Sequence, residues 1–385
     1  MTLTDSFQLQ DKAFFTLLQQ QTDLDLRDTR GKRHPMPLVL MGVLMAMLAG
    51  RDGSLSSIHR YLVNQFEWLA AHFQPAAKKP ISRAQLPRLL ALVNSQRFLA
   101  LVVQTYGLPL SQHQQSWLAG DGKELRGSIA PGQTRGLSCV SIVDQQSQLP
   151  LAQCYYDGRK QGERASILNL LTDNGLLCCK VSLDALHLTP KLLTAIAQQQ
   201  GCYLIGLKSN QHQLLRSCIL QTLVRPAQFV QIDQPEHKHG RHQEREYRYY
   251  SLADLPLDKR WSKAGLGTLI QVKRTRSDGA GRLLGYTESY YVSNAPVACQ
   301  SQATTLYEAV RGHWRVEVMH YRRDVVLSED SFRSLQSGVQ QIIGTFRTLS
   351  LSLLACLSTS MAHQMDRFSD RITELFDFLR VKRLL

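Results

Sequence analysis

The chain lacks any apolar stretch long enough to cross a bilayer, and it lacks cysteines at CxxC spacing. Its longest apolar run, residues 36–49, falls short of the roughly 20 residues that a membrane helix needs. Its eight cysteines form no CxxC pair. This argues against a zinc ribbon or disulfide framework and favours small buried side chains in a reducing compartment. The first ten residues are polar, without a signal-peptide core, so we expect a cytoplasmic protein with no membrane partner.

Acidic residues are also scarce relative to basic ones. The chain has 31 Asp and Glu against 45 Lys and Arg, a formal net charge of +14. Such a charge favours a polyanionic partner, most often nucleic acid, with simple solubility as the alternative. At 385 residues the chain can hold two or three structural units. We find no internal repeat and no low-complexity segment.

Hydrophobic spacing predicts five regions. Residues 1–110 read as a helical, DNA-binding region in which Ser54 caps a helix. Residues 111–221 turn to strands and form the first part of an α/β core. Within it, two apolar runs flank a helix that begins at Thr189, which predicts a βαβ unit with parallel strands. Residues 222–298 read as a β-rich insertion, 299–360 as the second part of the core, and 361–385 as a basic C-terminal helix and tail.

Three carboxylates have distinctive settings. Asp121 follows the first predicted strand, Asp184 ends an apolar strand, and Glu317 lies on a predicted helix. Polar side chains at the carboxyl ends of parallel strands meet at one edge of a sheet. Carboxylates gathered there repel one another unless cations neutralise them, as in two-metal sites that attack phosphodiesters. The plainer alternatives are a turn residue for Asp121, a helix cap for Asp184 and a surface residue for Glu317.

Basic, histidine and aromatic residues near these positions are candidate DNA contacts. The run 27–33 is kept from forming a helix by Gly31 and Pro35, so its cations suit phosphate contacts, although a solvated loop is the alternative. Trp314 has the chemistry to stack on a displaced base, or to pack in the core. The candidate DNA contacts are Arg27, Arg30, Lys32, Arg33, Lys123, Arg126, Lys208, His239, Arg241, Arg311, His313 and Trp314.

In order and spacing, several segments resemble the DDE transposases associated with the H-repeats of Rhs elements, a bacterial insertion-sequence family. The resemblance covers about residues 24–357. The segments that carry it are 27–35, 121–128, 183–185, 207–211, 239–241, 310–317 and 323–330.

The resemblance implies a ribonuclease-H-like mixed sheet core in an α/β fold, with the β-rich insertion and the N-terminal helical bundle attached. It implies that Asp121, Asp184 and Glu317 form a DDE triad that binds two Mg²⁺ or Mn²⁺ ions. It further implies double-stranded DNA (element ends and target) as the partner, a homodimer or higher oligomer in a synaptic complex, and a nucleoid-associated bacterial protein.

The chain departs from the family pattern around the third acid. Valines flank Glu317 where the family commonly has Ile-Glu-Asn, and the spacing from Glu317 to Asp324 is one residue shorter. A DNA transposase is the leading hypothesis. The alternatives are a catalytically inactive or domesticated DNA-binding descendant, and a nuclease that cuts DNA without joining it.

Overall fold

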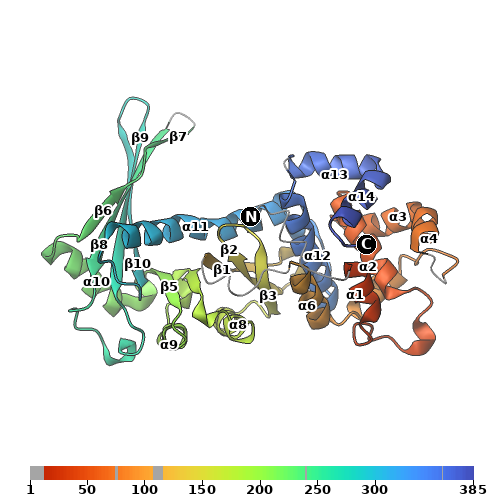
Figure 1. Cartoon of the computed structure of the whole chain (residues 1–385), viewed down its shortest axis with the longest axis horizontal. Helices are drawn as coiled ribbons and strands as arrows, with labels where there is room; N and C mark the ends of the chain where they lie inside the picture. The colour runs from red at the N-terminus through yellow and green to blue at the C-terminus, as the bar shows by residue number, and fades with distance from the viewer. Residues whose placement is uncertain (1–12, 74–76, 107–115, 239–240, 358) are drawn as a thin grey trace.

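The computed structural model describes residues 13–73, 77–106, 116–238, 241–357 and 359–385. The molecule is drawn out along one axis (Figure 1), with helices from both ends of the chain at one extremity, a mixed sheet in the middle and long strands at the other extremity. Within the described ranges, no helix is both long and apolar enough to traverse a bilayer. All eight cysteines are free; three of them are buried as expected, four are half-buried and Cys299 is exposed.

The helical extremity combines the first and last parts of the chain. Its helices are α1 (Phe14–Gln20), α2 (Met36–Leu48), α3 (Leu55–Asn64), α4 (Phe66–Phe73), α5 (Gln85–Ala91), α6 (Ser95–Tyr106), α12 (Ser337–Ala355), α13 (Met361–Asp370) and α14 (Ile372–Val381).

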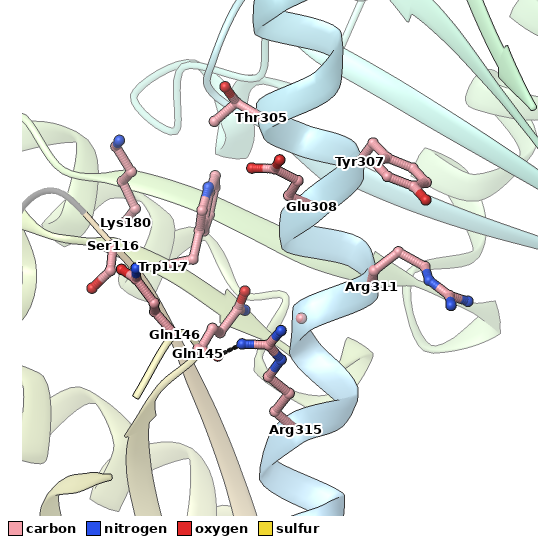
Figure 2. Close-up of a pocket in the computed structure, with 11 residues that line it drawn as sticks. Ser116, Trp117, Gln145, Gln146, Lys180, Thr305, Tyr307, Glu308, Arg311 and Arg315 are labelled. Atoms are coloured by element: carbon pink, nitrogen blue, oxygen red, sulfur yellow. Dashed lines mark hydrogen bonds between the residues drawn. The ribbon is translucent and has the colours of Figure 1, made fainter. Parts of the chain in front are cut away.

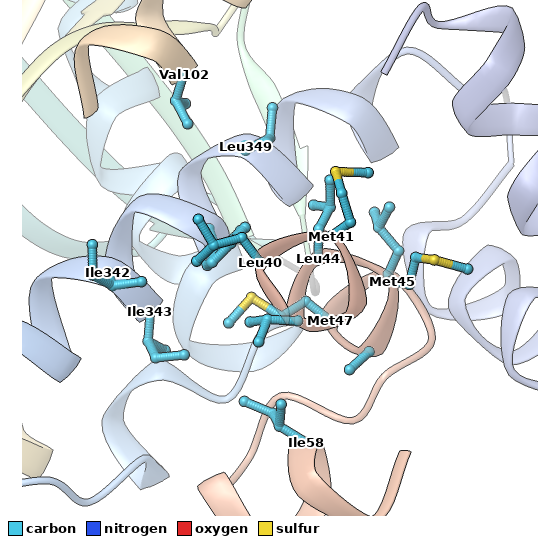
Figure 3. Packing of buried hydrophobic residues seen from close by; sticks show 14 of the residues in the cluster. Leu40, Met41, Leu44, Met45, Met47, Ile58, Val102, Ile342, Ile343 and Leu349 are labelled. Atoms are coloured by element: carbon cyan, nitrogen blue, oxygen red, sulfur yellow. The ribbon is translucent and has the colours of Figure 1, made fainter. Parts of the chain in front are cut away.

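Two local signals position α2 and α3 as the sequence predicts. Pro37 stands in the first turn of α2, where its missing N–H costs no hydrogen bond. The Ser54 hydroxyl accepts a hydrogen bond from the Ser57 N–H at 3.1 Å and so caps α3. Helix α2 is buried on nearly every side. Its Leu and Met side chains meet α12 residues such as Ile342 and Ile343 in one apolar cluster (Figure 3).

The middle of the molecule is one ten-stranded sheet ordered β3-β2-β1-β4-β5-β10-β9-β8-β6, with β7 paired to β8. Its strands are β1 (Trp117–Glu124), β2 (Ser138–Asp144), β3 (Pro150–Tyr156), β4 (Lys180–Leu183), β5 (Cys202–Leu207), β6 (Phe229–Ile232), β7 (Glu236–Lys238), β8 (Arg241–Ser251), β9 (Thr268–Asp278) and β10 (Leu283–Ser293). Among the strand pairs of the described residues, only β1–β4 and β4–β5 are parallel.

The predicted βαβ unit is confirmed. Strands β4 and β5 pair in parallel, and α9 (Pro190–Gln198) connects them. The Thr189 hydroxyl accepts from the Leu192 N–H and caps α9, and Pro190 occupies its first position. The cap and the proline start the helix soon after β4 ends, so the return strand β5 lies beside β4.

Helices cover the two faces of the sheet with separate apolar clusters. One cluster joins α8 (Lys160–Asp173), α9 and α10 (His212–Val224) to the sheet. The other joins α11 (Gln300–Val325) to β1, β5, β8 and β9. Figure 1 shows α11 running from the long strands past β1 and β2 toward α12. This helix therefore spans the region between the two extremities.

The β-rich segment 222–298 lengthens the same sheet rather than forming a second one. Strand β10 pairs with β5 antiparallel, and β9 and β8 follow it with eleven residues each. Its division from the core at residues 222 and 298 stays a prediction.

Two C-terminal expectations differ from the structure. The helix expected to pack on the sheet, α12, packs mainly against α2, α5 and α6. It is buried on almost all sides, which suits the centre of a helical cluster. The single last helix expected over residues 368–380 is two helices, α13 and α14, because Arg371 between them has extended backbone angles.

A buried charge network fixes α11 to α12 and to β1. The Arg323 guanidinium donates to Glu329 Oε1 at 2.6 Å, and both side chains are 1% exposed. Lys123 Nζ lies 3.1 Å from Glu329 Oε2. Burial alone raises the pKa of Glu329, but Arg323, Arg347 and Lys123 outweigh it and lower that pKa to about 2. The carboxylate is therefore ionised across the physiological range.

Replacement of Glu329 by alanine tests this network. Glu329→Ala leaves Arg323 buried beside no acid, so we expect the free energy of unfolding to fall by about 3–5 kcal/mol. Denaturant unfolding at neutral pH measures the change. Glu374→Ala is the matched control, because it breaks exposed pairs with Arg367 and Arg371 on the surface and should change stability far less. Equal losses in the two variants would contradict a structural role for the buried network.

Candidate active site

The pairing of β1 with β4 brings two of the predicted acids together. The parallel register runs from Trp117 beside Lys180 to Gly120 beside Leu183. One step further along the same register stand Asp121 and Asp184. Neighbouring strands are about 4.8 Å apart, and residues in register point to the same face. The two aspartates therefore lie side by side where β4 ends.

Of the three predicted acids, Asp121 has the largest pKa shift. Burial raises its pKa, the Asp184, Glu163 and Glu317 carboxylates raise it further, and a hydrogen bond from the Gly122 N–H opposes them; the resulting pKa is about 7. Like charges close to a buried carboxyl disfavour its ionised form. All three predicted acids thus interact electrostatically, because Asp184 and Glu317 both raise the pKa of Asp121.

Asp184 and Glu317 line one cavity of about 560 Å³, together with Lys208, His313 and Trp314. Asp184 Oδ1 accepts the Leu186 N–H at 2.8 Å, so Asp184 also caps the short helix η5 (Ala185–His187). The downstream helix α9 is capped by Thr189 instead, so Asp184 caps only this short turn and its carboxylate still lines the cavity. Glu317 reaches the cavity from α11, and burial raises its pKa while Lys208 lowers it.

Glu163 is a fourth acid that the sequence did not reveal. It lies on α8 and packs against Gly122, where an added Cβ would approach Glu163 Cδ to 2.7 Å. Its Oε2 accepts the Tyr156 hydroxyl at 3.0 Å, and its Oε1 lies 3.3 Å from His187 Nε2. Only the glycine after Asp121 hints at this close approach. Nothing in the local sequence of α8 marks Glu163 itself.

Two histidines of α11, His320 (buried) and His313 (half-buried), border the acids without neutralising them. His320 Nε2 lies 3.7 Å from Asp121 Oδ2, and burial lowers the pKa of His320 to about 3. His313 Nδ1 lies 3.1 Å from the Ser182 hydroxyl, and burial lowers its pKa to about 4 against the opposing effect of Asp184. Both rings are neutral at physiological pH. They share α11 with Glu317, as the helical spacing predicts.

The other predicted DNA contacts near the core have different surroundings. Lys208 and Trp314 line the cavity with the acids, and Trp314 is 57% exposed, which makes it a surface rather than a core aromatic. Lys123 contacts Asp324 and lies 3.7 Å from Asp330. Arg126 is largely exposed, 3.5 Å from Asp330. Arg311 pairs with Glu236 at 2.7 Å and lines a different cavity.

The four N-terminal cations, among the residues that the structure describes, do not line this cavity. Arg27 forms a two-point ion pair with Asp25, whereas Arg30 is almost fully exposed. Lys32 Nζ lies 3.7 Å from Asp25, and Arg33 is exposed. His239 lies outside the described residues, and Arg241 begins β8.

The carboxylate oxygens of the three predicted acids suit a divalent cation. In the described residues, however, they do not already converge as a ligand group. Among the described residues, no three His, Cys, Asp or Glu side chains meet as a cation-binding group. Oxygen ligands of the Asp and Glu type are those that Mg²⁺ prefers. Burial is the main reason that the pKa of Asp121 is raised, and repulsion from the Asp184, Glu163 and Glu317 carboxylates raises it further. A bound divalent ion would remove that repulsion.

Comparisons with known proteins identify the family of this chain. The family model described as "Transposase DDE domain" matches residues 104–352. The YbfL protein of Escherichia coli (strain K12) is 24% identical over 348 residues, which cover 86% of this chain and 87% of that protein. A solved synaptic complex of piggyBac transposase with hairpin DNA is similar with a TM-score of 0.46 and 10% identity, over 98% of this chain and 80% of that one.

The raised pKa of Asp121 predicts a specific pH dependence of stability. The unfolded carboxyl loses its proton near pH 3.8, whereas the folded one keeps it up to about pH 7. The wild type should therefore lose stability as pH rises between these values. Asp121→Asn removes this loss, so in a chelating buffer we expect it to be more stable than wild type at pH 8 by on the order of 2–4 kcal/mol. Little difference should remain near pH 4.

Denaturant unfolding at pH 4, 6 and 8 measures this effect. The control is Asp366→Asn, which neutralises an exposed acid on α13. The stability of this variant should change with pH as that of the wild type does. Mg²⁺ at pH 8 should raise the melting temperature of wild type and have little effect on Asp121→Asn. A constant difference between Asp121→Asn and wild type at all three pH values would contradict the electrostatic account.

Proposed function

This chain belongs to the Transposase DDE domain family, and from that premise we propose that it is a DNA transposase that cleaves and joins strands at insertion-sequence ends. The observation that carries the proposal is the register of β1 and β4, which sets Asp121 beside Asp184. The mutual effect of these acids and Glu317 on the pKa of Asp121 supports the same conclusion.

In this proposal Asp121, Asp184 and Glu317 hold the divalent ions. The ions, Mg²⁺ or Mn²⁺, would activate the attacking oxygen and stabilise the leaving oxygen of a phosphodiester. Asp121 first gives up the proton that its raised pKa retains near neutral pH. Lys208 lies in the same cavity and suits contact with the scissile phosphate. The exposed Trp314 ring offers a face on which an unstacked base can rest.

Several finer assignments go with this function. The strand order β3-β2-β1-β4-β5, with β1, β4 and β5 parallel, supports a ribonuclease-H-like core, and the motif pattern supports the H-repeat-associated subfamily. The helical region 1–110 and its exposed cation Arg30 suit DNA binding. We further propose a homodimer or higher oligomer around paired DNA ends, in the bacterial cytoplasm with the nucleoid.

One observation favours the alternative of a catalytically inactive DNA-binding descendant. Glu317 is an exposed side chain flanked by Val316 and Val318, and no completed ligand set stands in the described part of the chain. A nuclease without strand transfer would share the acids but would leave cut ends unjoined. The experiment below separates these possibilities.

Neutralising Asp184 tests the chemistry directly. Asp184→Asn keeps the side-chain shape but removes a charge from the paired aspartates, so we expect Mg²⁺-dependent cleavage of a labelled terminal-repeat duplex to fall by at least about a hundredfold. Asp173→Asn, an exposed acid at the end of α8, should cut at the wild-type rate. Thermal unfolding of each variant checks that the fold is intact.

The same assay tests Glu317 and joining. Glu317→Gln should lose cleavage as Asp184→Asn does, and a supplied 3′-hydroxyl end should become linked to target DNA. Cleavage by wild type that survives in Asp184→Asn overturns the catalytic assignment. Salt-sensitive DNA binding with no cleavage by wild type selects the inactive descendant. Cleavage without joining selects the nuclease.

A further inference from the structure

A second cavity lies on the other side of α11. It encloses about 750 Å³ and is bordered by the starts of β1 and β4, the turn after β2, and the first half of α11. Two of the acids that we propose as catalytic stand further along the same strands, Asp121 within β1 and Asp184 just after β4. Figure 2 shows the side chains that line this cavity, with Lys180 and Trp117 on the sheet side and Glu308, Arg311 and Arg315 on α11.

The helix presents separate side chains to the two cavities. Glu308, Gly312 and Arg315 line the second cavity, while His313 and Glu317 line the first. Successive residues turn by about 100° around an α-helix, so Arg315 and Glu317 point about 200° apart. The two cavities are thus separated by roughly one helix diameter, about 10–12 Å.

The second cavity is basic. Lys180, Arg311 and Arg315 border it, against a single acid, Glu308. Arg311 is engaged by Glu236 and Asp233. Arg315 donates to the Gln145 carbonyl oxygen, a neutral acceptor, and no acid pairs with it in the described ranges. The charge of Arg315 is therefore left to attract an anion.

A buried donor also lacks an acceptor there. Trp117 lines the cavity and is 8% exposed, yet its indole Nε1 has no hydrogen-bond partner among the described residues. An indole N–H can only donate, and a buried donor without an acceptor is costly. In Figure 2 the Trp117 ring lies between Lys180 and Glu308. No described residue supplies an acceptor to this N–H, whereas a phosphate oxygen can accept from it.

Hydrogen bonds connect this cavity rigidly to the first. Gln145 Nε2 donates to the Ser182 hydroxyl at 2.7 Å, and that hydroxyl lies 3.1 Å from His313 Nδ1 in the first cavity. Gly312 permits the contact, because a Cβ there would collide with the Gln145 amide. A ligand held in the second cavity therefore has a fixed position relative to Asp184.

We propose that this second cavity binds a nucleotide unit of DNA, with its phosphate against Lys180 and Arg315 and an oxygen accepting from Trp117. The inference rests on DNA as the substrate in the proposed function, and adds a contact on the far side of α11 from the acids. The volume leaves room for the attached sugar and base. The cavity would hold the strand a few nucleotides from the point of cleavage.

Binding measurements with matched variants test this site. Fluorescence anisotropy of a labelled duplex, in EDTA and over a range of salt, gives the affinity and its salt dependence. Lys180→Gln and Arg315→Gln should each weaken binding several-fold and lower the slope of log affinity against log salt by about 1. Lys191→Gln, an exposed lysine on α9, removes the same charge elsewhere and should leave both quantities unchanged. A lower melting temperature of Arg315→Gln would mean that its weaker binding can come from a loosened fold. In that case the test rests on the binding of Lys180→Gln alone.

A second arm separates DNA from a free nucleotide. A deoxynucleoside monophosphate is titrated into wild type and Lys180→Gln by calorimetry. Monophosphate binding that depends on Lys180 and is as tight as DNA binding overturns the assignment to DNA. An unchanged salt slope in both variants, while cleavage still depends on Asp184, overturns this inference and leaves the proposed function standing. Failure of wild type to bind DNA overturns both.

Discussion

The parallel register between β1 and β4 is the constraint on which the site depends. Because Gly120 pairs with Leu183, the next residue on each strand is an aspartate, and the two side chains share one face and one sheet edge. A shift of one residue would turn one of them to the opposite face. The buried apolar residues of β4 and β5 maintain this register, since slippage would expose them. The sheet therefore sets the spacing of the two aspartates.

Helix α11 is the second element that the site requires, and buried charges hold it in place. Its Arg323 is bound by Glu329 and by the Thr348 hydroxyl of α12, while Lys123 of β1 reaches the same carboxylate. Such a network is costly to break because each charge is desolvated. The helix that presents Glu317 is thus fastened to the strand that carries Asp121.

Local sequence signals predicted much of this arrangement, and long-range packing accounts for the rest. The caps Ser54 and Thr189, the strand Cys202–Leu207 and the parallel pair follow from short-range chemistry. The packing of α12 against α2 could not be predicted in this way, because the sequence of an apolar helix does not indicate which surface the helix covers. Glu163 was missed for the same reason. It meets Gly122 only through the packing of α8 on the sheet.

The charge distribution around α11 explains why a basic chain can contain so acidic a centre. Carboxylates gather on one side of the helix, where the pKa of Asp121 is about 7 and the neighbouring histidines are neutral. Cations gather on the other side, where Lys180 and Arg315 border the second cavity. A polyanion is attracted by the cations, but it can approach the acids only if their charge is offset. Divalent ions supply that offset, so in the proposed function metal binding and substrate binding reinforce each other across a single helix.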